Sequence, residues 1–204
     1  MGWSLRDYRG HKIVSHGGAL TGMVSTVQLV PDQKLGIVVL TNQEENGAYM
    51  AIVYHILDHV LQAPDNDWIA AYKQSILGLI RRSNEKEQKE AAARVNDSHP
   101  LASPAKLAGR YRDDWYGDVT ITQEAGKLVL RFTHTPLMVA DLEFWQYDTF
   151  KAVFRDKTVP DAFVTFWFNP DGNVDQMKMV PTNDLADFSF DYQDLKFVPV
   201  FEKK

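Results

Sequence analysis

The residues best suited to chemistry lie near the start of the chain, where His16 is followed by Gly17, Gly18 and Ala19. Glycine has no side chain, so another group can approach the backbone closely at these positions. Apolar and β-branched residues flank the segment on both sides, which favours extended structure. The pattern therefore predicts a strand whose backbone is open to close contact.

Two histidines, His55 and His59, are four residues apart on an expected helix and could form a metal-binding pair. A structural role is favoured, because both lie beside or behind the apolar stripe of that helix. In addition, no Glu or third ligand completes an HExxH-like arrangement. We therefore expect no metal site and no cofactor.

Three carboxylates, Asp113, Asp114 and Asp118, gather near Trp115. Paired carboxylates can perform acid–base catalysis. Because Gly117 lies among them, a solvated loop is the favoured interpretation.

Two further motifs also receive structural interpretations. His134, within Thr-His-Thr-Pro, is expected to be a surface turn residue. Ser103 and Lys106 fit the Ser-x-x-Lys pattern of a serine nucleophile. Pro104 follows the serine directly in a proline-punctuated loop, so this match is assigned to chance.

Composition is that of an ordinary globular protein, with 204 residues of which 45% are hydrophobic. The net charge of -5 gives no reason to expect nucleic-acid binding, which needs clustered positive charge. No apolar run reaches the length of about 18 residues that a membrane span requires. The absence of cysteine excludes disulfides and cysteine nucleophiles and leaves the compartment open.

Residues 1–62 are expected to form an antiparallel sheet and one helix. Extended runs are expected at 2–8, from Ile13 onward, at 23–30 and at 35–40, the last two joined by a short turn. A helix follows, with Asn46 as its N-cap. Its apolar residues repeat at helical spacing: Tyr49, Ile52, Val53, Ile56, Leu57, Val60 and Leu61.

Residues 63–106 are expected to connect two bodies. Asp67 can cap a helix whose apolar side runs from Trp68 to Ile80. From Asn84 to Arg94 the residues are strong helix formers with almost no apolar stripe, which predicts a solvated helix.

In residues 107–204 the apolar residues recur at every second position, as in Val119 and Ile121, and about eight strands are expected. A small antiparallel barrel closes its own edges and can enclose a side-chain core or one small ligand. Seven aromatic residues are expected to fill it: Phe144, Trp145, Phe154, Phe163, Phe166, Trp167 and Phe168.

An ordered series of segments resembles the C-terminal end of the serine β-lactamase and penicillin-binding-protein family, including its esterase and peptidase relatives. Gly2-Trp3 resembles the Gly-Trp before the family's third motif, and His16-Gly17-Gly18 resembles that motif in its His-x-Gly form. Residues 22–31, the LGIVVLTN segment at 35–42 and the helix at 46–61 complete the series.

The resemblance implies an enzyme that attacks a carbonyl with a serine held in a Ser-x-x-Lys turn of helix. In such an enzyme the third-motif strand lies beside the serine. By position, Ala19 would supply a backbone N–H to the oxyanion hole, and Gly17 and Gly18 would lie against the substrate. His16 would face the cavity in place of the usual lysine.

The chain departs from the family because no Ser-x-x-Lys, Tyr-x-Asn or Ser-x-Asn motif precedes Val14. It is therefore expected to be the C-terminal fragment of a serine hydrolase that acts on amide, ester or peptide bonds, and to be inactive alone. Its partners would be the remainder of the parent catalytic domain, or a second copy bound through the exposed sheet. The family implies a periplasmic or secreted parent.

Residues 107–204 resemble the lipocalin-like domain appended to many β-lactamase-related hydrolases. Residues 107–111 (LAGRY) match its opening Leu-x-Gly-x-Tyr, and residues 166–172 (FWFNPDG) match a later segment. The resemblance implies no settled catalytic role, so a non-catalytic binding or oligomerisation module, with a small apolar ligand in the barrel, is the alternative.

The expected fold class is α+β. It comprises a partial β-lactamase-like antiparallel sheet with a C-terminal helix over residues 1–62 and a helical connector over residues 63–106. An eight-stranded antiparallel lipocalin-like β-barrel over residues 107–204 completes it.

Overall fold

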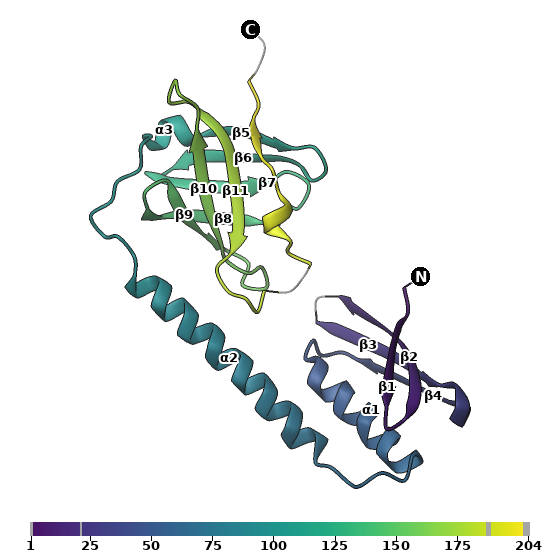
Figure 1. Cartoon of the computed structure of the whole chain (residues 1–204). Helices are drawn as coiled ribbons and strands as arrows, with labels where there is room; N and C mark the ends of the chain where they lie inside the picture. Colours follow the sequence, from purple (N-terminus) through teal and green to yellow (C-terminus); the bar gives the residue numbers. More distant parts are fainter. Residues whose placement is uncertain (1, 21, 187–188, 202–204) are drawn as a thin grey trace. The chain divides into compact units, whose positions relative to one another are not determined.

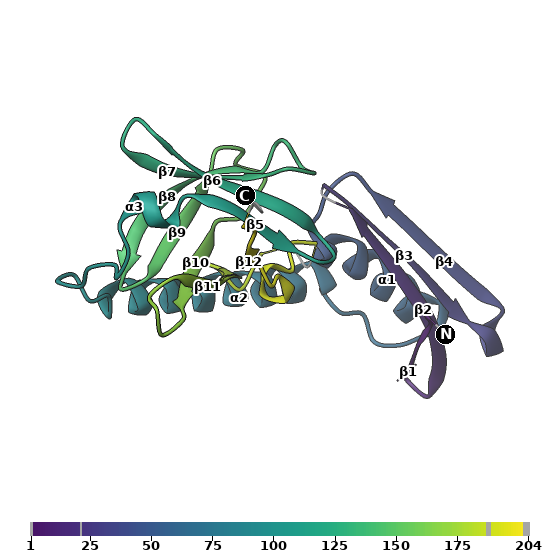
Figure 2. The ribbon, with the colours of Figure 1, turned by 90° about the horizontal axis from the view of Figure 1, so that it is seen from above.

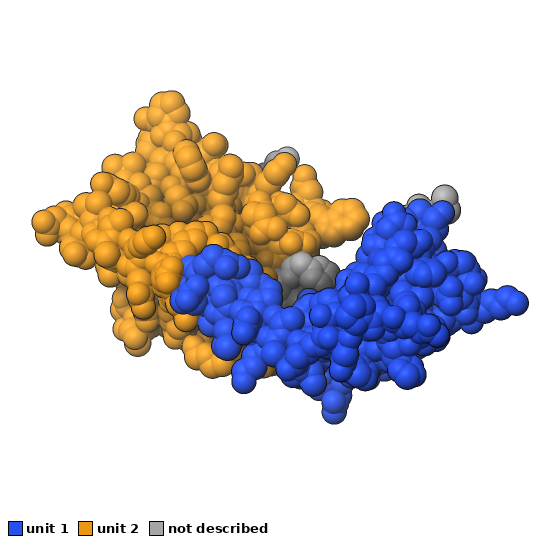
Figure 3. All heavy atoms as spheres, turned by 60° about the horizontal axis from the view of Figure 1, so that its bottom comes forward, with its two compact units in different colours: residues 1–82 blue, residues 83–204 orange. Residues whose placement is uncertain are grey.

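The computed structural model describes residues 2–20, 22–186 and 189–201. The chain divides into two compact units, Met1–Arg82 and Ser83–Lys204 (Figures 1 and 3). The fold is built mainly from β-strands, with few helices, and no helix in the described ranges is long and apolar enough to cross a membrane.

The first unit contains a four-stranded antiparallel sheet in the order β1-β2-β3-β4. Its strands are β1 (Ser4–Tyr8), β2 (His11–Leu20), β3 (Met23–Val30) and β4 (Leu35–Thr41). The short 3-10 turn η1 (Pro31–Gln33) joins the last two, which are antiparallel as expected. β2 continues through both glycines, because Gly17 and Gly18 keep their pairing with β3.

Helix α1 (Asn46–Val60) covers one face of this sheet (Figure 2). Val53 and Leu57 of the helix are fully buried against Ile13, Val30 and Ile37 of the strands. The expected N-cap was one residue off. The side chain of Glu45, not Asn46, accepts the hydrogen bond from the N–H of Gly47.

A buried carboxylate on α1 ties the parts of the first unit together. Asp58 is only 3% exposed and accepts hydrogen bonds from the hydroxyl of Tyr8 at 2.5 Å and from the indole N–H of Trp68 at 2.7 Å. Asn66 and Arg9 complete its donors at 3.2 and 3.3 Å. One side chain thus joins the β1–β2 hairpin, α1 and the start of the next helix.

Helix α2 (Trp68–Ala92) runs without interruption from the first unit into the second. The carboxylate of Asp67 accepts from the N–H of Ala70 at 2.9 Å, as a capping residue does. The residues after Asn84 are exposed, as expected. Nevertheless, this part of α2 is fixed to the second unit, because the Ser83 hydroxyl donates to Asn183 at 2.7 Å.

The second unit is an eight-stranded antiparallel barrel in the order β11-β10-β9-β8-β7-β6-β5-β12. A single helical turn, α3 (Pro104–Leu107), precedes it, and the turn η2 (Tyr192–Asp194) precedes the last strand. The N–H of Met177 in β11 donates to the carbonyl of Phe197, beside β12, at 2.8 Å and so nearly closes the barrel. The strands are β5 (Gly109–Asp113), β6 (Gly117–Glu124), β7 (Lys127–Phe132), β8 (Val139–Gln146), β9 (Thr149–Phe154), β10 (Ala162–Phe168), β11 (Val174–Pro181) and β12 (Val198–Pro199).

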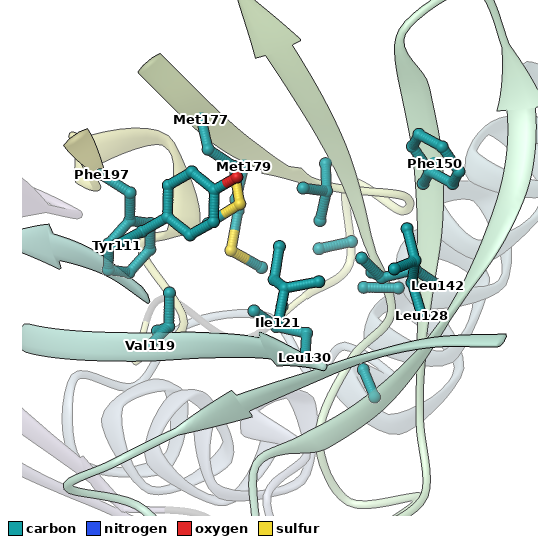
Figure 4. Packing of buried hydrophobic residues seen from close by; sticks show 14 of the residues in the cluster. Tyr111, Val119, Ile121, Leu128, Leu130, Leu142, Phe150, Met177, Met179 and Phe197 are labelled. Atoms are coloured by element: carbon teal, nitrogen blue, oxygen red, sulfur yellow. The ribbon is translucent and has the colours of Figure 1, made fainter. Parts of the chain in front are cut away.

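The interior of the barrel is occupied by side chains that alternate along the strands. Figure 4 shows Ile121, Leu130, Met177 and other members of this core pointing toward one another. Of the seven aromatic residues expected inside, Phe154 and Phe166 are buried, and Phe144 and Phe168 pack against the core.

The expectation was wrong for Trp145, Phe163 and Trp167, which are outside the core. For Phe163 and Trp167 the reason is the alternation of side chains along a strand. Phe163 and Trp167 alternate with the buried residues Val164 and Phe166, and therefore point to the outer face of β10.

The expectation of a solvated loop was also wrong for Asp113 and Asp118, which are buried. Asp113 accepts from three backbone N–H groups, those of Trp115, Tyr116 and Lys196, at 2.7 to 2.9 Å. Asp118 forms salt bridges with Arg110 and Arg112. Hydrogen bonding from Arg112, reinforced by Arg110, outweighs desolvation and lowers the pKa of Asp118 to about 2. Both carboxylates serve the barrel's structure.

Gly117 and His134 provide a test of barrel packing. Gly117 has a φ of +81°, and a Cβ there would lie 2.6 Å from the His134 ring. Gly126 has a φ of +82° with nothing within 4 Å. Gly126→Ala should cost about 1–2 kcal/mol of unfolding free energy in urea, and Gly117→Ala clearly more. Adding His134→Ala should recover the excess. Equal costs for the two glycine variants would contradict the contact.

Asp58 provides a test of the first unit. Burial alone would raise its pKa, but hydrogen bonds from Tyr8, Trp68 and Asn66 and the charge of Arg9 lower it below the usual value. Asp58→Asn should lower the free energy of unfolding of the first unit by about 1.5–3 kcal/mol, measured by hydrogen exchange in β1 and β2.

The cost should depend on pH with a defined sign. Because the pKa of Asp58 is lower in the folded chain than in the unfolded chain, its ionised carboxylate stabilises the fold at pH values above the unfolded pKa of about 3.9. This stabilisation is lost as the pH falls through the folded-state pKa. The difference between wild type and Asp58→Asn should therefore shrink below about pH 4. Asp65→Asn, an exposed neighbour, is the control. A pH-independent difference would show that the charge of Asp58 is not responsible.

Candidate functional site

The four residues predicted to form the site lie together on the second half of β2. His16 pairs with Val27, Gly17 with Thr26, Gly18 with Ser25 and Ala19 with Val24, all on β3. Because successive residues of a strand face opposite sides, His16 and Gly18 point away from the face on which Ile13 packs beneath α1.

The imidazole of His16 is held from one side by the residues just before β1. The ring centroids of Trp3 and His16 are 5.9 Å apart in an edge-on arrangement. A Cβ on Gly2 would lie 3.2 Å from Nε2 of His16, which is tighter than most contacts that real Cβ atoms make. Glycine at position 2 therefore allows the imidazole to lie this near the backbone.

Ser25 is a neighbour of the site that the sequence did not reveal. Its hydroxyl lies over Gly18 and donates to the Gly18 carbonyl at 3.4 Å. A Cβ on Gly18 would lie 2.9 Å from this hydroxyl oxygen. Only the strand register could have identified Ser25, because it places residues 18 and 25 opposite each other.

The sheet face that carries His16 and Gly18 is rich in exposed apolar side chains. Leu5, Val38 and Leu40 are 68%, 65% and 76% exposed. Trp3 and Leu29 add to the surface at 48% and 36%. Within the described residues of the first unit, no element covers this face. Exposed apolar surface of this extent is typical of a face that binds another part of a protein.

The other residues considered for chemistry do not join this site. His55 and His59 lie exposed on α1, and no cluster of three or more potential metal ligands occurs in the described part of the chain. Ser103 and Lys106 belong to the second unit, where Ser103 precedes the four-residue helix α3.

A second Ser-x-x-Lys match, Ser83 to Lys86, lies on α2 and was not singled out in the sequence. Ser83 is buried and its hydroxyl donates to Asn183, and Nζ of Lys86 lies 2.6 Å from Asp184. Both side chains therefore bind residues of the second unit rather than each other. The spacing here reflects two structural contacts and not an activated serine.

Comparison with known proteins identifies the second half of the chain. Residues 92–199, just over half of the chain, match the family described as "Domain of unknown function (DUF3471)". The chain belongs to this family. The match begins at the last residue of α2 and contains all eight strands of the barrel.

Two curated hydrolases are similar in sequence to this DUF3471 protein. Unguisins hydrolase ungD of Aspergillus violaceofuscus is 26% identical over 143 residues, covering 66% of this chain and 25% of the relative. Unguisins hydrolase ungD' of Aspergillus campestris is 30% identical over 132 residues, covering 59% and 24%. The chain thus spans about a quarter of the length of these relatives.

Solved structures show weaker similarity. The crystal structure of SurE aligns with 97% of this chain and 36% of its own at 17% identity, with a TM-score of 0.40. The C-terminal domain of penicillin binding protein Rv0907 aligns with 52% of this chain and 91% of its own at 20% identity, with a TM-score of 0.38. The expected relationship to hydrolases agrees with the two sequence relatives.

The contact between Ser25 and Gly18 predicts a coupling. Gly18→Ala should force the Ser25 hydroxyl to move, whereas in a Ser25→Ala background the added methyl group meets no oxygen. The unfolding free energies should therefore be non-additive by about 0.5 kcal/mol or more, with Gly18→Ala better tolerated in the Ser25→Ala background. Gly36→Ala, whose Cβ would make an ordinary 3.6 Å contact, should be additive with Ser25→Ala. Additivity of both pairs would contradict the geometry.

Proposed function

We propose that this chain is part of a serine hydrolase related to β-lactamases and penicillin-binding proteins, acting on amide, ester or peptide bonds. In this proposal, residues 1–62 belong to its catalytic domain and residues 107–204 form a lipocalin-like accessory barrel. Residues 63–106 connect these two parts. The observation that carries the proposal is the open face of β2, where His16 and Gly18 lie uncovered beside Trp3. The two hydrolase relatives support it.

The proposed chemistry uses the backbone of β2. A serine outside the described site attacks the substrate carbonyl, and the Ala19 N–H donates to the oxyanion that forms. Gly17 and Gly18 let the substrate lie against the strand, because neither adds a side chain. His16 faces the reacting groups from the open face. Losing one oxyanion donor typically lowers the rate about 10²–10³-fold.

The nucleophile is proposed to lie outside this chain. Both Ser-x-x-Lys matches belong to the second unit, where Ser83 is bonded to Asn183 and Ser103 precedes a single helical turn. The chain alone therefore provides one wall of a site and is proposed to be inactive.

The proposed partner is the remainder of the catalytic domain, seated on the open sheet face. The exposed side chains there are mainly apolar, so covering them would gain about 25 cal/mol per Å² of buried apolar area. Association of two copies through the same face is the proposed outcome when that remainder is absent.

The alternative function, a binding or oligomerisation module built on the barrel, has less support. A small apolar ligand would need interior space, but Phe154, Met177 and Phe197 are fully buried there. The barrel core is thus already made of side chains.

A covalent serine probe tests the proposal. A fluorophosphonate should not label this chain, because no serine among the described residues of β2 and its neighbouring strands has a lysine base bonded to it. A longer protein that adds a Ser-x-x-Lys segment to the same chain should be labelled, and changing that serine to alanine should abolish labelling. Stoichiometric labelling of this chain alone, mapped by mass spectrometry, would refute the proposal.

A further inference from the structure

The outer wall of the barrel carries a groove that the proposed hydrolase chemistry does not use. Its floor consists of outward-facing residues on neighbouring strands. Phe163 pairs with Val180, and Thr165 pairs with Thr149. The two threonine hydroxyls lie 2.9 Å apart, so each keeps a further hydrogen-bonding position for another group.

The walls of the groove come from the last turns of α2 and from the end of β8. Lys86 and Glu90 line it from the helix, and Ala93 lines it from the turn that follows. Trp145 and Gln146 contribute from the strand, and Asp184 from the chain after β11. The groove has a volume of about 570 Å³. This lies within the range of about 300–1,000 Å³ that is typical of small-molecule sites.

Specific hydrogen bonds hold the walls in place. The guanidinium of Arg94 lies over the Trp145 ring at 4.9 Å and donates from Nε to the Trp145 carbonyl at 2.7 Å. The N–H of Val95 donates to Gln146 at 2.9 Å, and Ser83 is bonded to Asn183. The helix wall and the aromatic wall are therefore set before any ligand arrives.

Charged side chains of both signs line the groove beside this floor. Nζ of Lys86 lies 2.6 Å from a carboxylate oxygen of Asp184. Glu90 is one helical turn further along, and among the described residues its carboxylate has no hydrogen-bond or salt-bridge partner. A lysine ammonium carries three donors, so Lys86 can hold Asp184 and a second carboxylate together.

We infer that this groove binds a small zwitterion with an apolar side chain, that is, an amino acid or a short peptide. The ligand's ammonium group contacts Glu90 and its carboxylate contacts Lys86, while its side chain lies on Phe163, Val180 and the edge of Trp145. The threonine hydroxyls form hydrogen bonds with its peptide groups. The inference does not depend on the proposed hydrolase activity.

The chemistry of the walls favours a zwitterion over other small ligands. A phosphate ester needs several cations, but among the described residues Lys86 is the only cationic one lining the groove, and Asp184 already neutralises part of its charge. A simple cation would pair with Glu90 but would leave the remaining donors of Lys86 without an acceptor. A ligand with one charge of each sign matches both walls.

The experiment titrates the whole chain with leucyl-leucine and follows ¹⁵N–¹H shifts by NMR. We expect saturable shifts for the Trp145 indole and for the amides of Phe163 and Thr165. Glu90→Gln and Lys86→Gln should each weaken binding about tenfold or more, since each removes a charge-assisted hydrogen bond. The matched controls Glu87→Gln and Lys89→Gln, on the same helix but outside the groove, should leave the affinity unchanged.

Four results would overturn the inference. One is the absence of shifts at these residues up to about 20 mM dipeptide, an affinity too weak to be specific. Another is equal binding of the uncharged analogue N-acetyl-leucyl-leucine amide. The third is loss of affinity in the control variants to the same extent as in Glu90→Gln. Saturable shifts with glucose but not with the dipeptide would likewise replace the zwitterion by a sugar.

Discussion

A β-sheet has two faces, and the first unit of this chain buries only one of them. Ile13 and Ile37 are packed under α1, whereas Val38 and Leu40 on the opposite face are mostly exposed. His16 shares the exposed face with this apolar surface. An element that bound to this face would remove the apolar side chains from water and would also enclose the candidate site. Binding of that one element is therefore expected to stabilise the unit and to complete the site together.

The covered face is held by polar as well as apolar contacts. Asp58 gathers donors from Tyr8, Asn66 and Trp68, while Arg6 donates to Tyr54 of α1 and to Gln28 of β3. Directional bonds of this kind fix the angle between helix and sheet more precisely than apolar burial does. They give β2 a defined position although its other face is open.

Local sequence patterns predicted the strands well, because period two is a property of neighbouring residues. They failed for Asp113 and Asp118, where the outcome depends on pairing. Across the β5–β6 hairpin, Arg112 lies opposite Asp118, and the β6 carboxylate is buried beneath two arginines. A charge that is paired and hydrogen-bonded can be buried, but its sequence neighbours do not reveal this. Ser25 escaped prediction for the same reason.

The two units differ in how complete they are. The two ends of the barrel sheet meet, because the bond between Met177 and Phe197 joins β11 to the residue just before β12, and Asp113 anchors the adjoining residue Lys196. Such a body has almost no free edge and needs no further strand. The sheet, by contrast, ends at β4, whose residues 35–41 (LGIVVLT) carry no charge and no proline to discourage pairing. The exposed apolar face and the unprotected strand edge are therefore both found in the unit that carries the candidate site, whereas the barrel is a nearly closed body.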